Sequence, residues 1–237
     1  MASIQDQSPR LAVLIDADNA SSQIVSGLFT EVAKIGEASV RRIYGDFSGT
    51  KLKAWADVLS QFAIIPQQNF ALTSGKNASD IALVIDAMDL LASDRFEAFC
   101  LVSSDSDFTR LAARIREQGV DVYGFGEKKT PESFRKACKR FIFTENLMQD
   151  AGADCTKTRL DNTTAVDAMP IIAKAIETLE DSDGWYPLSA LGLSISKLYP
   201  DFDPRSYGCP KLVSLIERSG AFEVRRQNLS VYIKPKT

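Results

Sequence analysis

The sequence predicts an α/β protein with a mainly parallel sheet and helices on both faces, followed by a small winged-helix domain. Three observations lead to this prediction. Short apolar runs alternate with segments of helical periodicity across residues 1–148. A polar stretch, residues 149–164, contains Leu160 as its only large apolar residue. The remaining residues, 165–237, show three helical patterns and then two alternating runs.

Strand candidates in the first part are short and rich in apolar, β-branched or aromatic residues. They are residues 11–15, 39–44, 62–65, 99–102, 120–125 and 141–143. Helical periodicity marks the segments between several of them, at residues 52–59, 81–88 and 108–115. Gly119 closes the last of these helices. Strands and helices that alternate at this spacing indicate a parallel sheet covered on both faces.

The last part has a different pattern. Helices are expected at residues 172–179, with Pro170 near the first turn, at residues 188–198, and at residues 212–216, before Gly220. Two alternating runs then flank residues 225–228, which predicts a β-hairpin with a basic tip. The predicted organisation is an α/β domain over 1–148, a linker over 149–164 and a winged-helix domain over 165–237.

Composition narrows the possible chemistry. The chain has 237 residues, of which 45% are hydrophobic and 25% are charged, a balance typical of globular proteins. It has no histidine, which excludes Ser-His-Asp and Cys-His catalysis and histidine-ligated zinc. No apolar run approaches the ~18 residues of a membrane span, and residues 1–10 lack a signal-peptide stretch. With four scattered cysteines, we expect a soluble, cytoplasmic protein without membrane association.

Aspartates follow two of the predicted strands directly. Asp16 comes after residues 11–15, and Asp105 and Asp107 follow residues 99–102. Asp80 lies at the head of a predicted helix, with Asp86 further along it. Carboxyl ends of parallel strands meet at one edge, and carboxylates gathered there repel each other unless a cation neutralises them. Mg²⁺ or Mn²⁺, which prefer oxygen ligands, are the expected cofactors.

Each of these residues also has a simpler interpretation. A single aspartate after a strand is equally well explained as a turn or helix-capping residue, and Asp105 could cap the helix that starts near Phe108. Lys76 could contact a phosphate or be a solvated loop lysine, and Asn19 could ligate or orient a water or adopt a left-handed turn. Three acidic groups at one predicted edge favour a site over separate capping roles.

The same residues resemble a known family. The Ile15-Asp16-x-x-Asn19 start, the Lys76 to Asp80 segment and the Ser103 to Phe108 motif are similar to the LabA-like subgroup of NYN domains, within the PIN-like nuclease superfamily. The resemblance covers residues 10–147. It implies metal-binding catalytic acids and residues that support them. The acids are Asp16, Asp80, Asp105 and Asp107, and the supporting residues are Asn19, Asp86 and Ser103. Ser104 departs from the family, which often has glycine there.

Residues 166–235 resemble the OST-HTH/LOTUS winged-helix domain. The similarity lies in residues 198–208, Lys211 and Phe222. It implies an adaptor that binds RNA or docks a protein partner. Lys211, Arg225 and Arg226 are the expected nucleic-acid contacts, the two arginines at the tip of the wing.

A further basic segment lies at residues 128–140. It carries six lysines and arginines against Glu132 alone, among them Lys128, Lys129, Arg135 and Lys136. These cations could hold the phosphate backbone of RNA, although an ordinary solvated helix face explains them equally well.

The leading prediction is therefore a metal-dependent endoribonuclease acting on RNA, expected to be single-stranded, with the winged helix recruiting the RNA or a protein partner. Oligomerisation is possible. One alternative is a catalytically inactive RNA- or protein-binding adaptor. A less favoured alternative is a phosphatase, suggested by the Asp16-x-Asp18 pair after the first strand.

Overall fold

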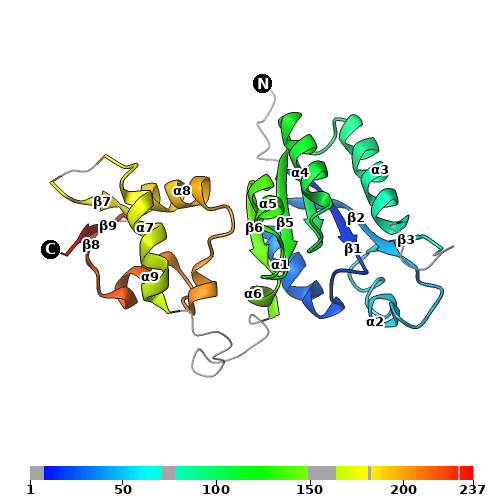
Figure 1. The fold of residues 1–237 in the computed structure, drawn as a ribbon, viewed down its shortest axis with the longest axis horizontal. Helices are drawn as coiled ribbons and strands as arrows, with labels where there is room; N and C mark the ends of the chain where they lie inside the picture. The colour runs from blue at the N-terminus through cyan, green and yellow to red at the C-terminus, as the bar shows by residue number, and fades with distance from the viewer. Residues whose placement is uncertain (1–7, 71–77, 149–163, 181–182, 229, 237) are drawn as a thin grey trace. The chain divides into compact units, whose positions relative to one another are not determined.

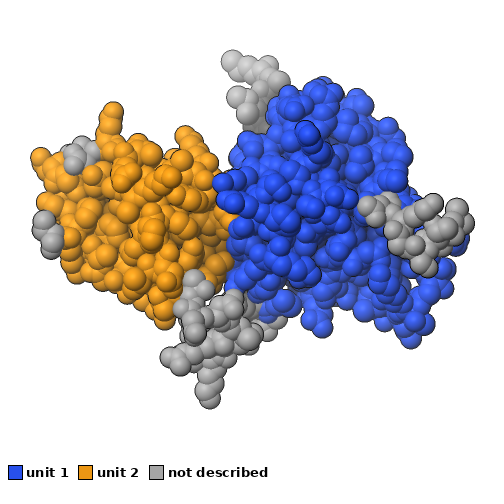
Figure 2. Space-filling model, in the orientation of Figure 1, with its two compact units in different colours: residues 1–152 blue, residues 153–237 orange. Residues whose placement is uncertain are grey.

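The structure is a computed structural model of the chain, and it describes residues 8–70, 78–148, 164–180, 183–228 and 230–236. The chain divides into two compact units, residues 1–152 and residues 153–237 (Figure 2). Each unit has its own hydrophobic core. Within the described residues, no helix has both the length and the apolar character needed to cross a membrane.

The first unit is built on a six-stranded sheet in which all neighbouring strands are parallel (Figure 1). The strand order is β3-β2-β1-β4-β5-β6, so the first strand lies in the interior of the sheet. The order reverses between β1 and β4, and ligands of open α/β sheets bind at such a point. The strands are β1 Arg10–Asp16, β2 Glu37–Gly45, β3 Ile65–Gln68, β4 Ala98–Val102, β5 Asp121–Gly126 and β6 Arg140–Phe143.

Helices cover both faces of this sheet. Those that line one core are α1, α2 and α6, and those that line the other core are α3, α4 and α5. Their bounds are η1 Ser22–Ile24, α1 Val25–Ile35, α2 Lys53–Ala56, α3 Ala78–Ala92, α4 Phe108–Glu117, α5 Glu132–Ala137 and α6 Glu145–Met148. The predicted fold class is confirmed.

The apolar sequence of β1 is explained by its burial on both faces of the sheet. Leu11, Val13 and Ile15 enter the core under α1, whereas Ala12 and Leu14 enter the core under α3 and α4. All five residues are fully buried. A parallel strand covered on both faces has no solvent side, so polar residues appear only where the strand ends. That end is Asp16.

The third strand lies three residues later than predicted. The sequence favoured residues 62–65, whereas β3 is Ile65–Gln68. Ala63 has a φ of 52°, which breaks the extended conformation before the strand begins. Phe62 instead stacks on Phe29 with ring centroids 5.7 Å apart, so its apolar character serves packing against α1.

The second unit combines helices with a small three-stranded antiparallel sheet of order β7-β9-β8. Its core includes Ile172 of α7, Leu191 of α8, Leu215 of α9 and Ile233 of β9, all fully buried. The elements are η2 Ala165–Ala168, α7 Met169–Ile176, β7 Tyr186–Pro187, α8 Leu188–Leu198, η3 Pro204–Tyr207, α9 Leu212–Ser219, β8 Phe222–Gln227 and β9 Ser230–Pro235. The predicted small domain of helices and a hairpin is confirmed.

The hairpin tip is shorter than the sequence indicated. Arg225 and Arg226 were expected at the tip, but both belong to β8, where they pair with Tyr232 and Val231. Side chains continue to alternate between the two faces through both arginines, because β8 extends to Gln227. Asn228, with a φ of 54°, takes the left-handed position of the turn. The two arginines therefore point to opposite faces of the sheet.

Candidate functional site

Asp16 is held rigidly at the end of β1. It is 1% exposed, and its carboxylate accepts hydrogen bonds from the Ser103 hydroxyl at 2.7 Å and the Asn19 side-chain amide at 2.8 Å. The backbone N–H groups of Asp18 and Asn19 also donate to it, at 3.0 and 3.3 Å. Burial raises the pKa of Asp16, and these hydrogen bonds oppose the rise. Asn19 and Ser103 therefore fix this carboxylate, and their role as supporting residues of a catalytic site stays a prediction.

The loop after β4 is ordered through the same serine. Ser103 is 2% exposed, and its Oγ accepts a hydrogen bond from the backbone N–H of Asp105 at 3.1 Å. The Asp105 carboxylate accepts the backbone N–H of Asp107 at 2.9 Å. Asp107 is the N-cap residue of α4, yet its side chain makes no capping hydrogen bond. Helix capping therefore does not explain the presence of Asp107. Asp105 does accept one backbone hydrogen bond within the local turn, as a turn residue would.

Asp80 brings the acidic groups together. It lies in the first turn of α3, and its pKa is raised to about 6 by burial and by the negative charges of neighbouring carboxylates. Those carboxylates belong to Asp16, Asp105, Asp18 and Asp107. The three other predicted acids thus lie near enough to Asp80 for their charges to raise its pKa, at the edge where the strand order reverses. We refer to Asp16, Asp80, Asp105 and Asp107 as the acid cluster.

One cation at this edge was missed by the sequence analysis. Lys51, in the turns between β2 and α2, donates to the Asp18 carboxylate at 2.6 Å. The Ser79 hydroxyl also donates to Asp18, at 3.3 Å. The hydrogen bond and charge of Asp18 raise the pKa of Lys51. Lys51 follows β2, and β2 lies next to β1 in the sheet. Its place after a strand that neighbours β1 is the sequence feature that could have identified it. Lys76, which could contact a phosphate or be a solvated loop lysine, lies outside the described residues.

Asp86 makes a separate set of contacts, further along α3. Its carboxylate accepts a hydrogen bond from Arg42 at 2.5 Å and another from the Tyr44 hydroxyl, both on β2. Burial, followed by the hydrogen bond and charge of Asp86, raises the pKa of Tyr44. These contacts join α3 to the sheet.

Several predicted RNA contacts have acidic or aromatic neighbours within their own domain. Lys129 pairs with Glu127 at 2.8 Å, and Lys136 pairs with Glu132 at 2.7 Å. The Arg135 guanidinium lies 5.8 Å from the centre of the Phe143 ring. The remaining predicted contact of this segment, Lys128, donates its backbone N–H to Glu145.

The small sheet of the second unit carries a cationic aromatic surface that the sequence analysis did not identify. The Arg225 guanidinium lies 4.4 Å from the Trp185 ring centre and 5.6 Å from that of Tyr232. The ammonium of Lys234 lies 6.0 Å from the Trp185 ring centre. Arg226 forms an ion pair with Glu217, and Lys211 is exposed at the start of α9. We call Trp185, Arg225, Tyr232 and Lys234 the aromatic platform.

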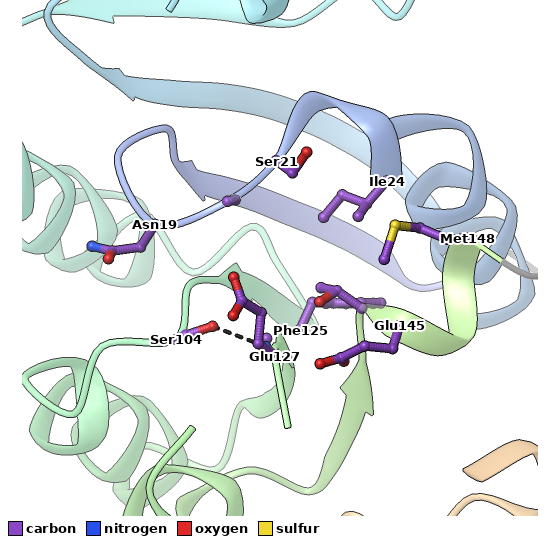
Figure 3. A pocket seen from close by; sticks show the side chains of 11 residues that line it. Asn19, Ser21, Ile24, Ser104, Phe125, Glu127, Glu145 and Met148 are labelled. Carbon is purple, nitrogen blue, oxygen red and sulfur yellow. Dashed lines mark hydrogen bonds between the residues drawn. The ribbon is translucent and has the colours of Figure 1, made fainter. Parts of the chain in front are cut away.

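A pocket of about 240 Å³ lies in the first unit, and Figure 3 shows the side chains that line it. It lies among the segments that follow β1, β4, β5 and β6, and it shares Asn19 with the site around Asp16. Its lining residues are Asn19, Ala20, Ser21, Ile24, Ser104, Phe125, Gly126, Glu127, Thr144, Glu145 and Met148.

The donor chemistry of the acid cluster suits a hard divalent cation. Burial and then the negative charges of four neighbouring carboxylates raise the pKa of Asp80. Mg²⁺ and Mn²⁺ favour such oxygen ligands and keep some of their waters. Across the described ranges, however, no three acidic or cysteine side chains are gathered closely enough to hold an ion as they stand. The cluster therefore fits a cation in charge and ligand type, with fewer than three carboxylates in place to hold one.

Comparisons with known proteins identify two domains. The family model of the NYN domain matches residues 10–148, and that of the OST-HTH/LOTUS domain matches residues 168–233. The assignment to the LabA-like subgroup remains a prediction. No curated protein matches the chain.

Two solved structures show limited similarity. A protein of unknown function from Vibrio parahaemolyticus is 20% identical over 60% of this chain and 94% of its own, with a TM-score of 0.48. The WlbA dehydrogenase from Bordetella pertussis, in complex with NADH and UDP-GlcNAcA, is 16% identical over 73% of this chain and 41% of its own, with a TM-score of 0.32.

Proposed function

We propose that this chain, which belongs to the NYN domain family, is a metal-dependent endoribonuclease that cleaves RNA at the acid cluster. An NYN domain joined to an OST-HTH/LOTUS domain indicates a nuclease or nucleic-acid binder related to RNA. The proposal adds metal dependence, catalytic turnover and named residues. The observation that carries it is the approach of Asp80 to carboxylates from two other segments, those after β1 and β4. Burial and the charges of these carboxylates raise the pKa of Asp80 to about 6.

The residues of the chain have distinct tasks in this proposal. Asp16, Asp80, Asp105 and Asp107 would hold Mg²⁺ or Mn²⁺, which would supply charge neutralisation at the phosphate and a more acidic water. Ser103 and Asn19 orient the Asp16 carboxylate through hydrogen bonds of 2.7 and 2.8 Å. These hydrogen bonds fix Asp16 at the end of a rigid strand, as a positioned reaction site requires.

RNA binding is assigned mainly to the second domain in this proposal. The aromatic platform combines ring faces with cations, which suits unpaired bases and their phosphates. The resemblance to RNA-binding OST-HTH/LOTUS domains supports the same assignment. A single-stranded substrate is therefore favoured, because bases in a duplex do not expose their faces.

An inactive RNA-binding adaptor is the second candidate, and one observation favours it. The Asp16 carboxylate already accepts four hydrogen bonds from within the domain, which fill the lone-pair positions of its two oxygens. A cation could bind there only by displacing at least one of these donors. The phosphatase alternative has less support, because the same four bonds restrain Asp16 from attacking phosphorus.

Cleavage of labelled single-stranded RNA in Mn²⁺, Mg²⁺ or EDTA distinguishes the two candidates. We expect cleavage in Mn²⁺ or Mg²⁺ and none in EDTA, with a loss on the order of a hundredfold or more in Asp107→Asn. Asp89→Asn is a matched control, because Asp89 is an exposed carboxylate on α3 outside the cluster. Cleavage by Asp107→Asn at the wild-type rate would exclude the proposed site. RNA binding without turnover in any metal would favour the adaptor.

A further inference from the structure

The pocket beside the acid cluster has an apolar interior. Ile24 is 1% exposed and Phe125 is fully buried, and Met148 adds a flexible apolar side chain at 46% exposure. Ser104, another lining residue, separates Ser103 from Asp105 in the chain, so the pocket is continuous with the loop that carries the acids. A group bound in this pocket would therefore lie next to whatever the acid cluster holds.

Two glutamates give the pocket its polar character, and they differ in their partners. The Glu127 carboxylate is paired with Lys129 at 2.8 Å. Oε1 of Glu145 accepts the backbone N–H of Lys128 at 2.9 Å, whereas its Oε2 is buried and has no hydrogen-bond partner in the described part of the chain. A buried acceptor without a donor is destabilising, so a ligand that supplies a donor to this oxygen gains a strong interaction.

These properties select the class of ligand. Glutamates disfavour a phosphate, while the apolar lining favours a flat, uncharged group that carries an N–H donor. At about 240 Å³ the pocket is smaller than those that enclose drug-sized ligands, which suits one ring system. A nucleobase with an exocyclic amino group meets all three requirements. Uracil also has one N–H donor, at N3, but two keto oxygens flank it and would approach the Glu145 carboxylate, whereas the amino group of cytosine or adenine has no keto oxygen beside it.

We propose that the pocket binds one base of the RNA, next to the phosphate at the acid cluster, and that Glu145 selects bases with an exocyclic amino group over uracil. The position of the phosphate rests on the proposed nuclease function. The selection by Glu145 does not, because it concerns binding alone.

Cytosine and uracil provide a matched test, since cytosine has an amino group where uracil has a keto oxygen. We would measure the affinity of the full chain for labelled trinucleotides of cytidylate and uridylate by fluorescence anisotropy in Mg²⁺, which neutralises the acid cluster. Phosphorothioate linkages in both trinucleotides slow metal-dependent cleavage during the measurement. Both strands carry the same phosphates, so the ratio of the two affinities isolates the base. We expect the wild type to bind the cytidylate about tenfold more tightly.

Glu145→Gln tests the residue itself. Its amide carbonyl can still accept the Lys128 N–H, while its NH₂ group replaces the unpaired acceptor with a donor, so the cytidylate preference should disappear or reverse. Glu132→Gln, an exposed carboxylate on α5 outside the pocket, should retain the preference. Met148→Trp should fill the pocket from its exposed side and reduce cytidylate affinity to that of uridylate.

Equal affinities in the wild type, or a preference unchanged in Glu145→Gln and Met148→Trp, would overturn the inference. The test separates it from the proposed function. Base preference without cleavage in metal would contradict only the nuclease proposal, whereas cleavage without base preference would contradict only the base pocket.

Discussion

In the NYN domain, carboxylates from three segments meet at the sheet edge between β1 and β4, whereas in the OST-HTH/LOTUS domain Arg225 and Lys234 lie over aromatic rings on one face of a small sheet. The first surface repels the RNA backbone until a cation neutralises it, and the second attracts the backbone directly. Under the proposed function, reaction and substrate retention are assigned to separate domains. The chain's net charge of −3 therefore says little about its affinity for RNA.

The largest expected effect that separates the two surfaces comes from Trp185→Ala. Removing this ring should reduce affinity for single-stranded RNA about tenfold, because stacking of one base contributes about 1–3 kcal/mol. The cleavage rate at saturating RNA should not change, since Trp185 belongs to the other domain. Filter binding and single-turnover cleavage measure the two quantities.

Two substitutions serve as controls for this experiment. Trp185→Phe keeps an aromatic face and should retain most of the affinity. Leu193→Ala removes another exposed apolar side chain of the same domain, at 65% exposure, and should have no effect. A loss of cleavage rate in Trp185→Ala at saturating RNA would show that the two domains do not act separately.

A smaller effect, on stability alone, is expected from Asp86→Asn. The substitution weakens the contacts of α3 with Arg42 and Tyr44, so the free energy of unfolding should fall by about 1 kcal/mol. Cleavage at a temperature where the protein stays folded should remain near the wild-type rate. Urea denaturation and the RNA cleavage assay measure these two quantities. A large loss of cleavage with unchanged stability would instead place Asp86 among the residues that support the acid cluster.

The smallest effects are expected for cations that are paired within the first domain. Lys129 is paired with Glu127 at the surface, so Lys129→Ala should change RNA affinity by no more than about twofold. Arg225→Ala should change it more and should reduce the salt dependence of binding by about one charge. Titrations at several salt concentrations give both slopes. If the salt dependence of RNA binding had the same slope in both variants, Lys129 would contact the RNA backbone as much as Arg225 of the aromatic platform does.

Sequence patterns predicted best the strands and helices whose apolar residues are all buried in a regular pattern. The run from Leu11 to Ile15 had to be an interior strand because every residue in it is apolar, and Asp16 then marked its end. The same reasoning located Asp105 and Asp107, since carboxyl ends of parallel strands share an edge. Family resemblance added Ser103, whose hydrogen bond to Asp16 no local pattern shows.

Features that depend on distant partners could not be predicted in this way. Lys51 reaches Asp18 from a turn 33 residues away, and Trp185 stands next to a two-residue strand with no periodicity of its own. The shift of β3 follows from the left-handed conformation of Ala63, which alanine does not normally favour. Periodicity identifies the buried face of an element, but not the side chain that will lie opposite it.

The position of β1 inside the sheet has a consequence for biosynthesis. Asp16 emerges early from the ribosome, but the Ser103 hydroxyl that holds it comes 87 residues later. Until β4 and the loop after it have been translated, a nascent chain carries Asp16 without Ser103, Asp105 or Asp107. The acid cluster is thus completed only after residue 107 of 237 has been translated, and a chain truncated before Ser103 would lack two of its four acids.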